Sequence, residues 1–509
     1  MHLQNFSISA AEFEAFQYCT NLRELVVTGP AQEFTGKAFD VVLKQARLIL
    51  ILCLFFCQDL VDVSGIRHLE YLNELSFSSC DFQTAKQERD GDPTCGMSKW
   101  NNEGQFMYLE KLEFVRVEPP ADQEGALTFL EKGAPNLVDV TIVNVGHVKL
   151  SDKTFGYLRG SCSESIKSIQ LGGLSALTDQ GVEQTLKSMK KLERLRFEDA
   201  KRFSDFEAVL SDSVVTALAP TLKHLFLAAF KEAKINKSVL ENGLSRLKSL
   251  EELFLFLAPF DDNCCDALLH LPNLLKFRSG SALAGTSLNF LRPCSNLVDL
   301  DVSYASSVSD ISVLSSDLPK LEHLSLFECT SVKSLEPFRH RQQQQHQQQE
   351  RRFVPLNTLD IRACTNKDIS PLKGVAIQYL RFSLESKEPD TVLETLSQIP
   401  GLSTCSWENS VSTNYLTKEV LLKYFGNGGI DLEKFRLSFA APPVDEEAKT
   451  DEHEEEEEEE GEVFDADLLF DLHQSKPRPL ITEVQMESWF DEMNAVRASN
   501  GLKAIVLLT

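Results

Sequence analysis

The side chains that could act as nucleophile, base or redox centre are the twelve cysteines and ten histidines of this 509-residue chain. Cys264 and Cys265 are adjacent, and His224 and His323 lie between regularly spaced apolar residues. Redox chemistry needs a reactive thiolate, and acid–base catalysis needs a correctly placed partner group. No phosphate-binding glycine loop, nucleophile elbow or H-E-x-x-H motif accompanies these residues. The pattern predicts a non-catalytic protein, with the cysteine pair in a buried turn and both histidines as surface contacts.

The cysteine spacing does not indicate a metal site. There is no C-x-x-C pair and no cluster of histidines, and several cysteines recur at one position of a repeating pattern. The N-terminus lacks a basic region followed by an apolar run, so no secretory signal is predicted. We therefore expect reduced, buried thiols and no cofactor or metal, with the cytoplasm as the expected location and the nucleus as the alternative.

The elements that would position any functional residue are short repeats. Leu297, Leu300 and Val302 are matched 24 residues later by Leu321, Leu324 and Leu326, and Ala305 by Cys329. The pattern L-x-x-L-x-L-x-x-C extends over about sixteen units, which begin at residues 22, 49, 72, 109, 137, 166, 192, 222, 250, 274, 297, 321, 356, 377, 402 and 432. Self-similarity at a period of roughly 20–29 residues predicts a solenoid.

The repeat pattern predicts an α/β solenoid with a parallel β-sheet on its concave side and helices or irregular turns on its convex side. The apolar run at 48–57 is shorter than a membrane span and fits a repeat strand, so no membrane partner is expected. Units of 26–30 residues leave room for helices, with Thr178 capping one of them, whereas units after Leu274 leave room for short 3₁₀ or extended segments.

The domain prediction has three parts. Residues 1–440 form the solenoid, with insertions at 82–106 and 339–352, the second being a glutamine-rich segment expected to be a disordered loop. Residues 441–463 form an acidic disordered linker. Residues 464–509 contain a helix and a strand that cap the solenoid, or alternatively serve as a separate interaction tail.

The charge of the chain is strongly local. Residues 441–467 hold fifteen acidic residues against Lys449, a large share of the net charge of −25. The remainder is mildly acidic and lacks the basic footprint of a nucleic-acid-binding face. We therefore expect a protein partner, no nucleic acid, no membrane, and a monomer.

Candidate binding residues come from the position between the second and third apolar residues of each repeat, which should face solvent. This position is mostly polar, but it holds Phe226 and Phe254, and Phe256 lies on the same strand face as Phe254. Exposed aromatic residues flanked by Arg196 and Arg278 are typical of a protein-binding hot spot. The alternative is that a segment such as 228–244 covers them.

A second, weaker candidate surface lies further along the chain. Its residues are Tyr304, Phe327 and Tyr379. They are aromatic residues close to the outward-facing positions of later repeats.

These motifs resemble those of leucine-rich-repeat proteins, from near residue 20 to near residue 440. The segments SDISVL at 309–314 and KDISPL at 367–372 are similar to the short repeats of internalins and of phosphatase-regulatory repeat proteins. LTDQGV at 177–182 resembles the longer cysteine-containing repeats of F-box substrate receptors. The resemblance implies a horseshoe fold and recognition of proteins on the concave face.

Three functions are compatible with this sequence. The first is a protein-binding scaffold. The second is the substrate-recognition subunit of a ubiquitin ligase, and the third is an acidic chaperone-like binder of basic proteins, suggested by the glutamate-rich stretch.

Overall fold

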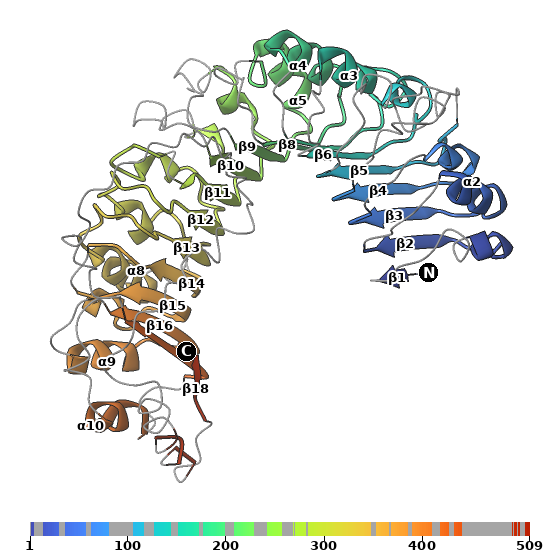
Figure 1. The fold of residues 1–509 in the computed structure, drawn as a ribbon. Coiled ribbons are helices and arrows are strands. Elements are labelled where there is room, and N and C mark those ends of the chain that lie inside the picture. Colours follow the sequence, from blue (N-terminus) through green and yellow to red (C-terminus); the bar gives the residue numbers. More distant parts are fainter. Residues whose placement is uncertain are drawn as a thin grey trace, which may run out of the picture. The chain divides into compact units, whose positions relative to one another are not determined.

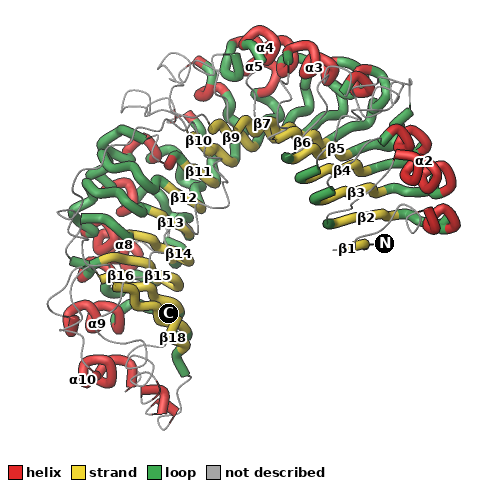
Figure 2. Tube along the Cα trace, viewed as in Figure 1, coloured by secondary structure: helices red, strands yellow, loops and turns green. Residues whose placement is uncertain are grey.

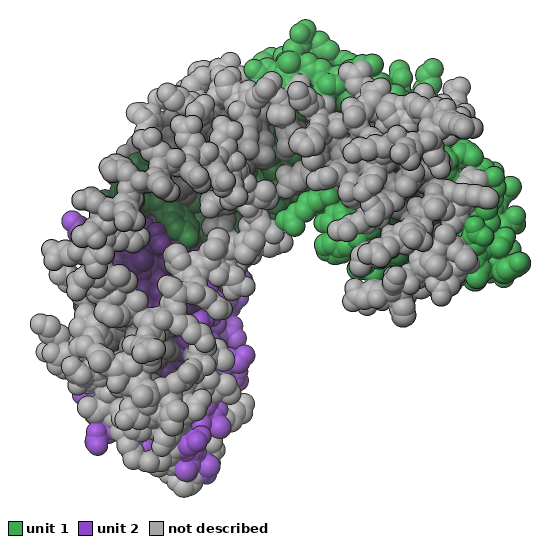
Figure 3. All heavy atoms as spheres, viewed as in Figure 1, with its two compact units in different colours: residues 1–313 green, residues 314–509 purple. Residues whose placement is uncertain are grey.

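The computed structural model describes residues 2–4, 14–29, 36–57, 63–80, 105–116, 127–143, 151–172, 177–198, 208–228, 242–256, 268, 270–280, 283–347, 353–365, 368–384, 389–409, 418–426, 432–439, 491, 493–495, 497–498 and 504–508. The chain divides into two compact units, residues 1–313 and residues 314–509 (Figure 3).

Unit 1 contains parallel strands that pair with one another in sequence order (Figure 1). They are β1 (His2–Gln4), β2 (Glu24–Thr28), β3 (Ile51–Phe55), β4 (Glu74–Ser78), β5 (Lys111–Val115), β6 (Asp139–Val143), β7 (Ser168–Gly172), β8 (Arg194–Glu198), β9 (His224–Ala228), β10 (Glu252–Phe256), β11 (Lys276–Arg278) and β12 (Asp299–Asp301). The apolar run at 48–57 is confirmed as strand β3. Strand β1 was not predicted.

Unit 2 continues the same plan with strands that again pair in parallel and in sequence order. They are β13 (His323–Ser325), β14 (Leu356–Ile361), β15 (Ile377–Ser383), β16 (Thr404–Asn409), β17 (Lys434–Phe439) and β18 (Val506–Leu508). Strands β2 to β17 correspond one to one with the predicted repeats.

Helices lie on the side of each sheet opposite its open face (Figure 2). In unit 1 they are η1 (Ala15–Tyr18), α2 (Gly36–Gln45), η2 (Ser64–His68), η4 (Thr128–Glu131), α3 (Asp152–Gly156), η5 (Tyr157–Arg159), α4 (Asp179–Leu186), α5 (Asp212–Leu218), η6 (Leu244–Arg246) and η9 (Asn289–Leu291). Further along the chain are η10 (Ser312–Ser315), α8 (Glu336–Gln347), η11 (Ser370–Leu372), α9 (Pro389–Ser397), α10 (Lys418–Leu421) and the π-helical turn η13 (Leu422–Gly426).

Local capping explains where several of these turns begin. Thr178 caps α4 as predicted, because its side-chain oxygen accepts a hydrogen bond from the Gly181 backbone N–H. In the D-I-S segments, the carboxylate of Asp310 accepts a bond from Ser312 N, and that of Asp368 accepts one from Ser370 N. The short repeats therefore start their 3₁₀ turns with an aspartate.

The hydrophobic core consists of apolar side chains stacked from one strand to the next. Leu225, Leu253, Phe277 and Leu300 occupy equivalent positions on β9 to β12, and each is fully buried. Burial of one such side chain contributes about 1.5–3 kcal/mol. Since side chains alternate along a strand, the residue between two buried ones must face outward.

The repeat cysteines also belong to the core. Cys80 Sγ donates to Leu54 O at 3.2 Å, Cys294 Sγ to Leu271 O at 3.5 Å, and Cys364 Sγ to Leu326 O at 3.1 Å. Burial raises the pKa of the Cys294 thiol to about 12. The predicted buried thiols are confirmed at these positions. The raised pKa keeps the Cys294 thiol protonated at neutral pH, and a protonated thiol is inert.

The glutamine-rich segment differs from the prediction. A disordered loop was expected over 339–352, but α8 extends to Gln347, and residues 348–352 lie outside the described part. Glutamine has a good helix propensity. In addition, the buried Arg341 guanidinium donates to the carbonyls of Leu318 and Leu321 at 2.9 and 3.2 Å, which holds the helix in place.

The C-terminal segment returns to the last repeat. Strand β18 pairs with β17, and Asn494 Oδ1 accepts a bond from Ile505 N at 2.8 Å. The fully buried Arg497 donates to Phe425 O at 2.9 Å. The described part of this segment therefore contacts the last repeat, and the choice between a cap and an interaction tail remains a prediction.

Several predictions concern residues outside the described part of the chain. These are the cysteine pair at 264–265, most of the insertion at 82–106, the covering segment at 228–244 apart from its ends, and the acidic linker at 441–463. They remain predictions.

Replacing a stacked core residue should lower the stability of unit 1. We expect Leu253→Ala to reduce the free energy of unfolding by about 2–5 kcal/mol, because it removes buried surface and leaves a cavity. The measurement is urea unfolding of the full chain followed by circular dichroism. Thr141→Ala, at an outward position of β6, is the control and should change stability by less than about 0.5 kcal/mol; equal effects would contradict the core assignment.

Candidate protein-interaction site

The predicted outward residues of unit 1 form one continuous row across the sheet. Strand register places Arg196 beside Phe226, Phe226 beside Phe254, and Phe254 beside Arg278. Phe256 lies on the same face, two residues after Phe254. These five half-buried residues, here called the aromatic patch, come from the neighbouring strands β8 to β11.

The three phenylalanines contact one another on the sheet surface. The ring centroids of Phe226 and Phe254 are 5.9 Å apart, and those of Phe226 and Phe256 are 5.6 Å apart. Both pairs are tilted at 35–40°. This arrangement is within the favourable range for aromatic pairs, so the rings form one apolar surface held by mutual packing.

An arginine covers each end of this cluster. The Arg196 guanidinium lies 4.1 Å from the Phe226 ring centroid, and that of Arg278 lies 5.4 Å from the Phe254 centroid. Arg196 also pairs with Glu198, and Arg278 pairs with Asp299 at 2.8 Å. Each arginine side chain keeps 38% of its surface exposed. The arginines are therefore oriented by cation–π contacts and ion pairs while remaining accessible.

Phe256 also rests against a glycine. Gly280 has φ of +50°, and a Cβ atom placed there would lie 2.9 Å from Phe256 Cδ1. Only glycine combines this left-handed backbone with space for the ring. Gly280 was not identified from the sequence, because the contact depends on the fold of the loop after β11.

An ionic group borders the patch along the same strands. Glu252 accepts hydrogen bonds from Lys276 at 2.7 Å and from His224 at 2.9 Å. Burial acts to raise the pKa of Glu252, but the bonds from Lys276 and His224 outweigh it and lower the pKa below the ordinary value. His224 is thus engaged in a surface contact, as predicted.

The residues of the second predicted surface belong to different units. Tyr304 lies in unit 1, just after β12, with 37% of its surface exposed and φ of +65°. In unit 2 the Phe327 ring faces the Arg362 guanidinium at 4.7 Å, and the Tyr379 ring faces that of Arg381 at 4.9 Å. Each of the two unit 2 aromatics is thus paired with an arginine.

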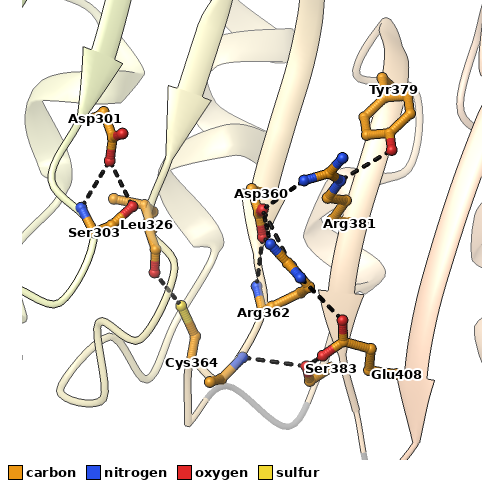
Figure 4. Close-up of polar contacts among 11 residues, drawn as sticks. Asp301, Ser303, Leu326, Asp360, Arg362, Cys364, Tyr379, Arg381, Ser383 and Glu408 are labelled. Atoms are coloured by element: carbon orange, nitrogen blue, oxygen red, sulfur yellow. Dashed lines mark hydrogen bonds and ion pairs between the residues drawn. The ribbon is translucent and has the colours of Figure 1, made fainter. Parts of the chain in front are cut away.

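Sequence reasoning missed a polar network on the sheet face of unit 2 (Figure 4). The nearly buried Asp360 accepts bonds from Arg362 Nη2 at 2.8 Å and Nε at 3.0 Å, and Arg362 Nη1 donates to Glu408 at 3.1 Å. Asp360 occupies the position between the second and third apolar residues of its repeat, which was expected to face solvent, but it is buried. In the same unit, His323 Nδ1 lies 3.2 Å from Thr358 Oγ1, again a surface contact.

An exposed apolar group at the start of the strands was also missed. Leu50, Tyr71, Met107 and Tyr108 are each 40–56% exposed, and the two tyrosine rings stack at 5.6 Å.

Among the described residues, no group of three or more potential ligands could hold a metal ion. The described helices also include none long and apolar enough to cross a membrane.

The contact between Phe256 and Gly280 can be tested by substitution. Gly280→Ala should lower stability more than Gly401→Ala, since both positions have positive φ but only Gly280 has the phenylalanine ring at 2.9 Å. The backbone term alone is about 1–2 kcal/mol in each case. Urea unfolding of both variants measures the difference. Equal losses would show that Phe256 does not depend on Gly280.

Comparison with known proteins identifies the fold. The search of protein-family models gives no match, and neither does the search of curated proteins. Among solved structures, the chain is similar to a leucine-rich-repeat protein of Leptospira interrogans, with a TM-score of 0.53 and 16% identity over 88% of this chain and 97% of that one. It is also similar to an internalin of Listeria monocytogenes, with a TM-score of 0.42 and 14% identity over 78% of this chain and 88% of that one. With its parallel strands in sequence order and its repeating apolar positions, the chain has a leucine-rich-repeat fold.

Proposed function

We propose that this chain is a non-catalytic scaffold that binds a protein partner through the aromatic patch. The observation that carries the proposal is the half-exposed cluster of Phe226, Phe254 and Phe256 on a sheet face whose other outward residues are mostly polar. Contiguous exposed aromatic surface is a common property of interaction sites.

The geometry of the patch suits tight recognition. Binding hot spots are rich in aromatic residues and arginine, and here two arginines flank three phenylalanines. The rings pack on one another and the arginines already lie against them, so little conformational entropy is lost when a partner binds. The exposed arginine edges could pair with carboxylates or carbonyls at the rim of an interface.

A non-catalytic role also fits the state of two buried cysteines and two histidines. Burial raises the pKa of the thiols of Cys162 and Cys364 to about 12. His224 and His323 are engaged with Glu252 and Thr358. We propose further that the protein is monomeric and cytoplasmic, with the nucleus as the alternative location.

The test removes the aromatic surface without touching the core. We expect Phe254→Ser together with Phe256→Ser to reduce partner recovery at least about tenfold, because hot-spot residues each contribute about 2 kcal/mol or more. Recovery is measured by affinity purification of the tagged full chain followed by quantitative mass spectrometry.

Two controls make the result interpretable. Phe55→Ser removes an outward phenylalanine from β3 of the same sheet and should leave recovery unchanged. Circular dichroism of all variants checks the fold. If the double variant is folded and recovers its partners normally, the aromatic patch is not the binding site.

A further inference from the structure

Among the described residues, the sheet face of β15 to β17 in unit 2 carries more cations than carboxylates. Register places Arg381 beside Ser406 and Ser406 beside Arg436. In the adjoining row, Thr404 separates Tyr379 from Lys434. Arg381, Lys434 and Arg436 are here called the basic strip; they flank β16, whose residues between them carry hydroxyl groups.

Two members of the strip are open to solvent. Lys434 and Arg436 are exposed, and neither forms an ion pair within the described part of the chain. Exposed cations that form no ion pair remain available to a ligand.

The third member, Arg381, is held in place but only partly neutralised (Figure 4). Its Nε donates to the Tyr379 hydroxyl at 3.0 Å, and its guanidinium lies 4.9 Å from that ring's centroid. Its nearest carboxylate is Asp360, at 3.8 Å, which already accepts shorter bonds from Arg362. Arg381 therefore presents an oriented guanidinium with bonding capacity left over.

The carboxylates on this face do not neutralise the positive charge of the basic strip. Asp360 is nearly buried beneath Arg362, and Glu408 is bonded to both Arg362 and Ser383. With Arg362, which follows β14, four cations and these two carboxylates lie on this face among the described residues. A positive surface on a chain with a net charge of −25 is a local exception.

We propose that the basic strip binds an acidic peptide segment of a partner protein. Strand spacing puts the backbones of β15 and β17 roughly 10 Å apart, so a peptide over β16 could place carboxylates toward both sides. Arginine binds carboxylates through two parallel hydrogen bonds, and the hydroxyl group of the half-buried Thr404 could add a weaker one, whereas Ser406 is buried. A nucleic acid fits less well, since its binding depends on a broad basic footprint that this acidic chain lacks.

The experiment uses a fluorescently labelled peptide of alternating glutamate and serine, titrated with the full chain and followed by anisotropy. We expect saturable binding that weakens as salt is raised, because exposed charges are screened. Lys434→Ser together with Arg436→Ser should weaken binding at least tenfold. The matched control, Lys187→Ser with Lys190→Ser, makes the same charge change on exposed residues of unit 1 and should have no effect.

The same titrations contain the results that would overturn the proposal. Unchanged affinity in the folded Lys434→Ser, Arg436→Ser variant would remove the strip as the site. Tighter binding of a single-stranded RNA oligonucleotide would assign the strip to nucleic acid. Binding that appears only after Glu454–Glu460 are replaced by serine would assign it to this chain's own acidic stretch. Because Phe254→Ser with Phe256→Ser should leave peptide binding intact, failure of the two proposals can be told apart.

Discussion

The structure depends on the burial of alternating apolar side chains between adjacent parallel strands. A single repeat cannot bury its leucines, so each strand requires the next one at a fixed spacing. The stacked Leu225, Leu253, Phe277 and Leu300 show this on β9 to β12. The same constraint turns one intervening residue of every strand outward. The outward row is therefore a consequence of the core, and its composition is free to serve binding.

Aromatic residues at the outward positions carry a cost in free energy, because they expose apolar surface to water. Phenylalanine on a solvated sheet exposes apolar area, and the chain reduces that cost by packing the rings on one another and beneath Arg196 and Arg278. The loop after β11 contributes as well, since Gly280 leaves room for Phe256. The phenylalanine rings of the aromatic patch are thus held by one another, by the two arginines and by the loop that contains Gly280. A rigid apolar surface of this kind favours association because little order is lost on binding.

The two candidate surfaces use different forces. The aromatic patch relies on apolar burial, which is insensitive to salt, whereas the basic strip relies on charge, which salt screens. In unit 2, the Asp360 carboxylate contacts two arginines at different distances. Asp360 holds Arg362 by short bonds and leaves Arg381 at 3.8 Å with spare donors. A chain with one fold can therefore present chemically distinct surfaces on different repeats.

Several features were accessible from the sequence because they depend on local spacing alone. The repeat period located strands β2 to β17, identified residues 48–57 as a strand, and placed Phe226 beside Phe254. Thr178 was recognisable as a cap because the capping bond spans only three residues. Low sequence complexity was a poor guide to the glutamine-rich segment, where α8 is anchored by Arg341 through carbonyls about twenty residues away.

The alternation of buried and outward positions is readable from the residues alone, since hydrophobic periodicity is a local property of the chain. Which outward groups contact a neighbouring side chain depends on the folded arrangement. The placement of Phe256 over Gly280, of Arg362 on Asp360 and Glu408, and of Arg381 on Tyr379 depends on side-chain rotamers and loop geometry. Phe256 and Gly280 are 24 residues apart, and Arg362 and Glu408 are 46 residues apart. In each contact the partners become neighbours only because separate repeats are stacked by the same core.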